Sequence, residues 1–262
     1  MANCLCGAKR SIPLSYPCLK RTIFITGTDT GAGKTVLTAL LAAFFRSQKI
    51  RVAAFKPVCS GGRADAEKIR AALGGVLTLD EINPWHFRAA IAPVLAARRE
   101  NKFVTLAQVL AHLHATRKNF AVTLVEGAGG LLSPLGDCSG GLRPSPQASA
   151  LTERRYKKSF DSRDLILALR AAPVIVAQNK LGVVNHLLLT LEALPKNSRA
   201  SAKIVLMSPA KPDSATKTNA KLLGEFFPPE KIFTLPWLGN RFPPAAVLKN
   251  LAVRRVLQKL AL

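Results

Sequence analysis

Short runs of apolar residues, unbroken by polar positions, recur along the chain and are separated by segments with helical spacing. Continuous apolarity, in place of strict alternation, is typical of strands that are covered on both faces. The strands expected from these runs are 22–27, 50–56, 121–127, 173–179, 203–207 and 231–236. The segments expected to be helical are 34–47, 65–73, 105–117, 186–194, 215–227 and 244–260. This alternation predicts an α/β fold, a doubly wound and mainly parallel sheet with helices on both faces.

Two segments depart from this rhythm. Residues 1–20 contain bases and no acid, and they lack the apolar core of a secretory signal, so we expect a flexible N-terminal extension. Residues 138–159 are rich in Ser, Gly and Pro and hold one acid, Glu153, which predicts a mobile surface insertion. The remainder, 21–262, is long enough for a single domain with a large core.

The chain carries 38 Lys and Arg against 15 Asp and Glu, a net charge of +23. Such an excess is compatible with nucleic acid or with small anionic ligands. The bases are scattered and lack the interleaved aromatics of a nucleic-acid surface, so nucleic acid is not the expected partner. No apolar stretch reaches the length of a membrane span, and we expect no membrane association. The five irregularly spaced cysteines indicate a reducing compartment, the cytoplasm, although organellar targeting by residues 1–20 stays open.

The first expected strand runs into the glycine-rich segment GTDTGAGKT, residues 27–35, which precedes the first expected helix. Small residues allow backbone N–H groups to converge on phosphate oxygens, and the helix N-terminus adds its positive dipole end. Lys34 then reaches the β- and γ-phosphates of a nucleoside triphosphate, and the Thr35 hydroxyl is placed to hold Mg²⁺. The motif departs from the common spacing, because Gly27 and Gly33 are separated by five residues instead of four.

Further polar residues follow other strands. FKPVCSG (55–61) places Lys56 and Ser60 after the second strand, and VEGAGG (125–130) places Glu126 at the end of the third. Ligands of doubly wound sheets bind beyond the carboxyl ends of the strands, so these residues are expected beside the triphosphate. Thr35, Asp65 and Glu126 form an oxygen-rich set that suits Mg²⁺, although Asp65 is also a favourable acid at a helix N-terminus.

Together these motifs resemble the dethiobiotin synthetase family. Its members carry a GTDTxxGKT loop, a KPVxSG segment, an EGAGG turn and a KLGxxNH segment, which stand here as GTDTGAGKT, FKPVCSG, VEGAGG and NKLGVVNH (179–186), with LPWLG (235–239) near the end. The resemblance covers roughly residues 21 to 240 without the insertion, and the five-residue glycine spacing is the family's own form. It implies a P-loop NTPase fold.

The resemblance also implies a reaction, the ATP-dependent ring closure of 7,8-diaminopelargonate with CO₂, and a homodimer with substrate at the subunit interface. Carbamate formation would be followed by attack on the γ-phosphorus of ATP and by ring closure through the second amine. Lys34, Lys56 and Ser60 are then expected to be catalytic. Thr30, Lys56, Ser60, Lys180 and Asn185 are expected to bind substrate, and Asn185 could also cap the helix that follows it.

The nucleotide-binding set implied by the resemblance combines the phosphate loop with three later segments. It comprises Thr30, Gly31, Ala32, Gly33, Lys34, Thr35, Val36, Glu126, Gly127, Gly129, Ser208, Pro236 and Trp237. One position departs from the family, because Ser208 and Pro209 stand where Asn-Asp is common and the Asn contacts adenine. A Ser hydroxyl cannot reproduce the paired donor and acceptor of an amide, which bears on nucleotide selectivity.

Two alternatives remain open at this point. The first is a partition- or cell-division-type ATPase switch that binds DNA or a membrane, but that class carries an extra Lys in the loop where this chain has Asp29. The second is a degenerate, non-catalytic relative. The KPVxSG-type segment favours the enzyme over the switch.

Overall fold

A central parallel sheet organises the protein, and its strands follow the apolar runs of the sequence. The computed structural model describes residues 21–137, 159–239 and 243–261, so the expected extension 1–20 and nearly all of the expected insertion 138–159 lie outside the described residues. The sheet has six strands in the order β10-β9-β8-β1-β5-β2, and every pair is parallel. The strands are β1 (Arg21–Gly27), β2 (Val52–Phe55), β5 (Val122–Glu126), β8 (Ala172–Gln178), β9 (Lys203–Met207) and β10 (Ile232–Leu235).

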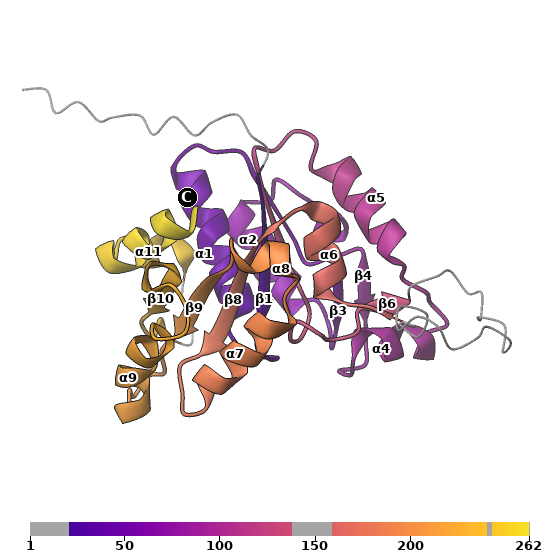
Figure 1. Ribbon diagram of the computed structural model, residues 1–262. Coiled ribbons are helices and arrows are strands. Elements are labelled where there is room, and N and C mark those ends of the chain that lie inside the picture. Colours follow the sequence, from indigo (N-terminus) through magenta and orange to yellow (C-terminus); the bar gives the residue numbers. More distant parts are fainter. Residues whose placement is uncertain (1–20, 138–158, 240–242, 262) are drawn as a thin grey trace, which may run out of the picture.

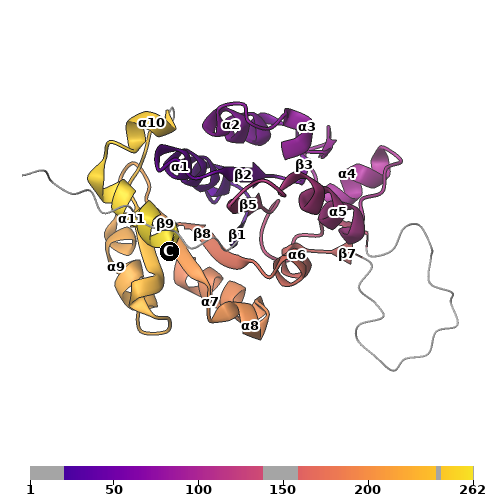
Figure 2. The ribbon, with the colours of Figure 1, turned by 90° about the horizontal axis from the view of Figure 1, so that it is seen from above.

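Helices cover both faces of this sheet, as expected for a doubly wound fold (Figure 1). Seen from above, the helices α1 and α2 lie on one side of the sheet and α6, α7 and α8 on the other (Figure 2). The longer helices are α1 (Lys34–Ser47), α2 (Ala64–Leu73), α5 (Leu106–Thr116), α6 (Ser162–Leu169), α7 (Val183–Ala193), α9 (Ser214–Leu223) and α11 (Leu251–Ala261). The shorter ones are α3 (Leu79–Ile82), α4 (Pro93–Arg99), α8 (Lys196–Arg199), α10 (Pro244–Val247) and the 3₁₀ turn η2 (Pro229–Lys231).

Several elements correct or extend the sequence expectations. The expected helix 244–260 is broken into α10 and α11, and Asn250 accepts the Ala252 and Val253 N–H groups at the start of α11. Two small sheets were not predicted, because their strands form no apolar run in the sequence. They pair β3 (Val58–Ser60) with β4 (Trp85–Phe87), and β6 (Gly136–Asp137) with β7 (Ser159–Phe160). Ser159, the last residue of the expected insertion, is thus paired with Asp137.

The register of the sheet brings chemistry-bearing residues together. Ile25 of β1 lies opposite Glu126 of β5, and Phe55 of β2 lies opposite Val125. The residue after Phe55, Lys56, therefore reaches the same edge of the sheet as Glu126. The phosphate loop follows β1 at this edge as well, because parallel strands all end there.

The helix α11 closes one side of the core. Val253, Leu257 and Leu260 are buried along one face, while Leu251, Arg254 and Arg255 are exposed. This basic, amphipathic C-terminal helix therefore packs its apolar face on the fold. Within the described ranges, no helix is both long and apolar enough to cross a membrane.

We expect Leu257→Ala to lower the free energy of unfolding by about 2–5 kcal/mol, because it leaves a cavity beneath α11. Leu251→Ala, on the exposed face of the same helix, is the matched control and should change it by less than about 0.5 kcal/mol. Chemical denaturation of the two variants measures the difference. Equal effects would contradict the assignment of α11 to the core.

Candidate active site

The phosphate loop connects β1 to α1 through left-handed glycines. Gly31 has φ 73° and Gly33 has φ 100°, a region that residues with a Cβ rarely adopt. A Cβ on Gly33 would also come within 3.0 Å of the Met207 side chain. Gly33 is the N-cap of α1, so the unpaired N–H groups of that helix face the loop. The local geometry is that of an anion cradle.

A cavity of about 620 Å³ opens beside this loop. It is lined by residues from the phosphate loop, β3, α2, the start of α4 and the glycine turn after β5. Among the predicted site residues, the lining includes Thr30, Gly31, Gly33, Lys34, Thr35, Val36, Lys56, Ser60, Asp65 and Gly129. Segments more than ninety residues apart in sequence, such as Thr35 and Glu126, are thus brought to one place.

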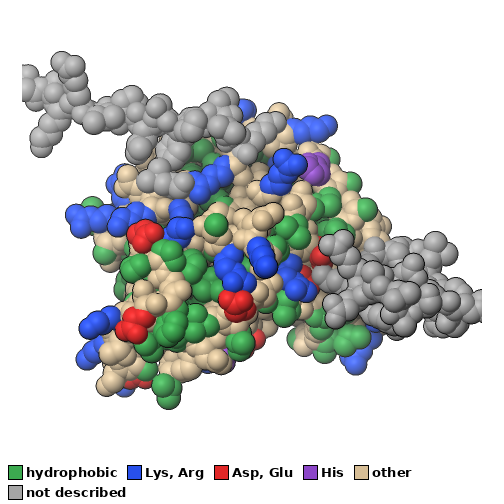
Figure 3. Space-filling view, in the orientation of Figure 1, with side chains coloured by type: hydrophobic (Ala, Val, Ile, Leu, Met, Phe, Trp, Pro, Cys, Tyr) green, Lys and Arg blue, Asp and Glu red, His purple; other side chains and the backbone are tan. Residues whose placement is uncertain are grey.

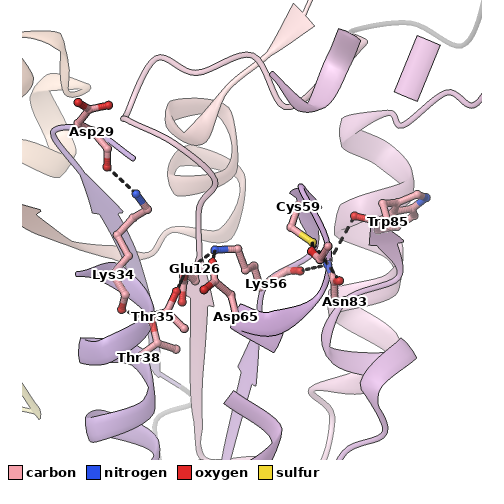
Figure 4. Close-up of polar contacts among 11 residues, drawn as sticks. Asp29, Lys34, Thr35, Thr38, Lys56, Cys59, Asp65, Asn83, Trp85 and Glu126 are labelled. Atoms are coloured by element: carbon pink, nitrogen blue, oxygen red, sulfur yellow. Dashed lines mark hydrogen bonds and ion pairs between the residues drawn. The ribbon is translucent and has the colours of Figure 1, made fainter. Parts of the chain in front are cut away.

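Lys56 lies at the centre of the polar contacts (Figure 4). Its ammonium Nζ donates to Asp65 Oδ2 at 2.6 Å and to Glu126 Oε1 at 2.6 Å. The Thr35 hydroxyl donates to the same Glu126 oxygen at 2.6 Å. Lys56 and Glu126 are buried, and Asp65 is partly exposed at the cavity. Four residues from four separate segments therefore form one charged network.

The donor set suits a hard divalent cation. Glu126 Oε2 is buried and has no hydrogen-bond partner among the described residues, while Thr35 Oγ1 and the Asp65 carboxylate lie in the same network. Mg²⁺ in nucleotide sites is typically bound by one or two carboxylates and by phosphate oxygens, without an all-protein cage. In the described part of the chain, no three His, Cys, Asp or Glu side chains cluster to form a metal site of protein ligands alone. Thr35, Asp65 and Glu126 fit the ion.

The two site lysines have opposite electrostatic environments. Burial, together with the nearby charge of Lys56, lowers the pKa of Lys34 to about 8. Lys34 is held by a hydrogen bond from Nζ to the Asp29 carbonyl oxygen at 2.7 Å. Burial also disfavours the charge of Lys56, but Glu126 and Asp65 outweigh it and raise the pKa of Lys56 above its ordinary value. Burial opposes the Asp65 charge as well, but Lys56 lowers the pKa of Asp65. Lys56 therefore stays charged, and no carboxylate of the described residues lies at hydrogen-bond distance from the Lys34 ammonium.

A second cavity of about 510 Å³ lies on the other side of the phosphate loop. Among the predicted site residues, its lining includes Gly31, Ala32, Gly33, Val36, Lys180, Ser208, Pro236 and Trp237. Lys180 thus lies with the expected nucleotide-base residues and not in the cavity of Lys56 and Ser60. Because Gly31, Gly33 and Val36 line both cavities, a nucleotide on the loop would direct its phosphates to the first and its base to the second.

The amide side chains around the second cavity are already engaged. Asn179 donates to the Thr216 carbonyl at 3.0 Å and accepts from Asn219 at 2.8 Å. The Gln178 amide nitrogen donates to the Gly31 carbonyl at 3.0 Å. Ser208 lines this cavity, with its backbone N–H donating to the Leu235 carbonyl, so its hydroxyl is the group that stands where the family has an amide. The role of Ser208 with the base stays a prediction.

Other predicted residues have different settings. The Ser60 hydroxyl donates to the Ile91 carbonyl at 2.6 Å, which leaves its oxygen free to accept from an amine. Gly127 allows a close approach, because a Cβ there would come within 2.7 Å of Ser162 Oγ. Asn185 is exposed on α7 and lines neither cavity. The possibility that Asn185 caps this helix is wrong, because α7 begins at Val183 with Gly182 as its N-cap.

The structure adds cavity residues that the sequence did not single out. They are Cys59, Lys68, Ala90, Ile91, Ala92, Pro93, Ala128, Ser133 and Pro134. Cys59 was visible within FKPVCSG, and Lys68 stands one turn after Asp65 on α2. The 90–93 stretch had no motif, and only the packing of α4 against β3 and β4 brings it to the site.

Comparison with known proteins agrees with this site. Residues 21–138 match a family model described as an AAA domain. "ATP-dependent dethiobiotin synthetase BioD" of Anaeromyxobacter dehalogenans (strain 2CP-C) is 37% identical over 222 residues, 83% of this chain and 90% of that protein. The proteins of the same name from Akkermansia muciniphila and Methanococcus vannielii are 34% and 32% identical over 79% and 66% of this chain, and over 87% and 72% of their own lengths.

Among solved structures, "Structure of pNOB8 ParA bound to nonspecific DNA" aligns with a TM-score of 0.54 at 13% identity, over 93% of this chain and 98% of that one. At this identity the likeness shows the P-loop α/β fold alone. The sequence relatives, in contrast, span most of both chains and share one name. The chain therefore belongs to the ATP-dependent dethiobiotin synthetase family.

Proposed function

We propose that the first cavity closes the ureido ring of dethiobiotin from 7,8-diaminopelargonate, CO₂ and ATP, a step of biotin biosynthesis. The observation that carries the proposal is the position of Lys56. It is a buried, charged ammonium held by Glu126 and Asp65 at the edge of the phosphate-loop cavity. A reaction between two anions, a carbamate and a triphosphate, needs such fixed cations to offset their repulsion.

Each residue of the network has a role in this proposal. Lys34 and the loop N–H groups bind the β- and γ-phosphates, and Lys56 binds the carbamate and the transferring phosphoryl group. Ser60 accepts a hydrogen bond from an amine of the substrate. Thr35, Asp65 and Glu126 hold Mg²⁺, which, when bound, neutralises phosphate oxygens.

The bonds change in three steps. One amine attacks CO₂ and loses a proton, which gives a carbamate. A carbamate oxygen then attacks the γ-phosphorus while the bond from that phosphorus to ADP breaks. Finally the second amine attacks the carbamate carbon and loses a proton, and the C–O bond to phosphate breaks. Lys56 faces negative charge in all three steps, so a fixed cation there lowers each barrier.

The rival switch function is less well supported. Asp29 stands where the switch ATPases carry their additional lysine. On the face drawn in Figure 3, the Lys and Arg side chains are scattered among apolar and uncharged ones and form no continuous stripe. The ParA structure, bound to nonspecific DNA, shares only the fold with this chain.

We also propose that two copies of the chain pair through α7 and that Asn185 reaches the substrate of the neighbouring subunit. Leu181 is 82% exposed and Leu189 is 62% exposed. Because residues four apart share one helix face, Asn185 and Leu189 lie side by side, with Leu181 just before α7. Contiguous exposed apolar side chains with polar residues around them are typical of protein–protein interaction sites.

Lys56→Met should reduce formation of dethiobiotin by at least about a hundredfold, because a fixed cation is lost from the reacting anions. The affinity for ATP should stay within about threefold, since Lys34 and the loop still bind the phosphates. Product formation from the diamine and bicarbonate, and calorimetric binding of ATP, measure the two effects. Lys217→Met, an exposed lysine on α9, is the control. If wild-type ATP hydrolysis is indifferent to the diamine, the proposed function is wrong.

The affinity for ATP should fall as the pH rises. The pKa of Lys34 is about 8 in the nucleotide-free protein, and phosphate oxygens raise it on binding. The charged form is therefore nearly complete only below about pH 7 and half populated at about pH 8, and between about pH 8 and about pH 9 the affinity should drop about fivefold with uptake of a proton. Titration calorimetry in buffers of different ionisation enthalpy measures the affinity for ATP and the number of protons taken up on binding. Lys34→Arg, which stays charged, should remove the pH dependence; a pH-independent wild type would refute this role.

The wild-type protein should sediment as a dimer, and Leu189→Lys should sediment as a monomer with a KM for the diamine raised about tenfold or more. A buried lysine in an apolar interface lacks a partner, which accounts for the dissociation. Leu251→Lys, at an exposed leucine of α11, should leave both the dimer and the KM unchanged. A Leu189→Lys protein that still sediments as a dimer would exclude α7 as the interface.

A further inference from the structure

Asn83 is completely buried between α3 and β4, yet it lies outside both cavities. Its amide nitrogen donates to the backbone carbonyl of Lys56 at 2.7 Å. Its amide oxygen lies 3.2 Å from the Cys59 thiol, which is the donor of that contact. Figure 4 shows Asn83 between Cys59 and Lys56, on the side of Lys56 away from Glu126.

The segment that carries Lys56 is held along its backbone by residues 82–85. The Lys56 N–H donates to the Ile82 carbonyl at 3.0 Å, and the Trp85 N–H donates to the Pro57 carbonyl at 3.1 Å. The side chain of Asn83 supplies the contact between these two, at the carbonyl of Lys56 itself. Lys56 has left the regular pairing of β2 here, because β2 ends at Phe55. Asn83 thus replaces a strand partner at the reactive residue.

The backbone carbonyl of Lys56 orients this amide. A carbonyl can only accept, so the nitrogen end of the Asn83 amide must face it. The Cys59 thiol lies 3.2 Å from the Asn83 amide oxygen and 3.1 Å from the Gly62 carbonyl, and its single hydrogen can be donated to either. Burial raises the pKa of the Cys59 thiol, which keeps its hydrogen in place. The Asn83 carbonyl in turn accepts from Arg63 Nη2 at 3.0 Å, and Arg63 is the N-cap of α2, the helix that carries Asp65. One buried asparagine therefore contacts the segments of both Lys56 and Asp65.

We propose that Asn83 is a positioning residue for Lys56, acting through the hydrogen bond from its amide nitrogen to the Lys56 carbonyl. It touches no reacting atom in this arrangement and acts by holding the Lys56 backbone, so that Nζ stays between Glu126 and Asp65 at the cavity. Small displacements of such a group reduce the rate strongly, because preorganised charges act over short distances. The inference rests on the proposed function of Lys56.

The test separates the rate of ring closure from nucleotide binding. Asn83→Asp keeps the size of the side chain and an acceptor for Cys59, but it removes the donor to the Lys56 carbonyl and places a carboxylate there. We expect kcat for dethiobiotin formation to fall about ten- to a hundredfold, with the calorimetric Kd for ATP changed by less than about threefold. Asn83→Ser, which keeps a smaller donor, is the substitute if Asn83→Asp does not fold. It should also lower kcat and leave the Kd for ATP within about threefold.

A matched control exists on the nucleotide-base side of the molecule. Asn219 is also buried, and its amide donates to the backbone carbonyl of Lys180 at 3.1 Å. Asn219→Asp should weaken the binding of ATP and leave kcat at saturating ATP within about twofold, the opposite pattern. Leu257→Ala, destabilised beneath α11, should keep both kcat and Kd when assayed well below its melting temperature.

Two results would overturn the inference. The first is an Asn83→Asp protein that keeps kcat within about twofold of the wild type. The second is a parallel loss of kcat and ATP affinity in Asn83→Asp and Leu257→Ala, which would show a general effect of stability. If Asn83→Asp keeps the wild-type kcat while Lys56→Met is inactive, only the positioning role of Asn83 is refuted. If the wild-type protein shows no diamine-dependent turnover, the proposed function itself is refuted.

Discussion

The contact between Lys56 and Glu126 determines how the rest of the site is arranged. Both side chains are buried, and an unpaired charge of either kind in that position would be strongly unfavourable. Neither residue can therefore be understood alone: Glu126 keeps Lys56 charged, and Lys56 allows a carboxylate to end a buried strand. Removing one partner of such a pair typically destabilises a protein by about 3–5 kcal/mol, so this pair links stability to chemistry.

The sheet register makes this contact possible, and the phosphate loop divides the space around it. Glu126 is the last residue of β5, and Lys56 directly follows Phe55, the last residue of the neighbouring strand β2, which pairs with Val125. The loop after β1, the next strand along, then lies beside them. Because the loop has a cavity on each side, the phosphates and the base of a nucleotide bound on it would lie in separate cavities. The charged network can thus act on the phosphate end without contact to the base.

Much of this could be predicted from the sequence, because apolar runs and glycine loops are local signals. All six strands of the main sheet were expected from continuous apolarity, and Lys34, Thr35, Lys56, Ser60 and Asp65 follow strands or open helices at the edge where ligands bind. The short pairings of β3 with β4 and of β6 with β7 were not predicted, because strands of two or three residues show no periodicity in the sequence. Asn83 was missed for a different reason, because its importance depends on a contact across 27 residues that only the fold creates. The hypothesis of helix capping by Asn185 failed because Gly182, in a left-handed conformation at φ 85°, begins the helix three residues earlier.

The net charge of +23 was the least informative sequence feature, and the site explains why. At the centre of the site, Asp65 and Glu126 both contact Lys56, whereas the ammonium of Lys34 contacts the backbone carbonyl of Asp29. Charges elsewhere on the surface are screened beyond about 8 Å at physiological ionic strength, so they contribute little to the affinity for a bound phosphate. They can raise the rate at which anionic substrates arrive, which is a long-range effect that depends on salt. In the proposed mechanism, binding and catalysis depend on a few buried charges whose positions the fold fixes. The overall charge of the chain does not distinguish this enzyme from a DNA-binding protein of the same fold.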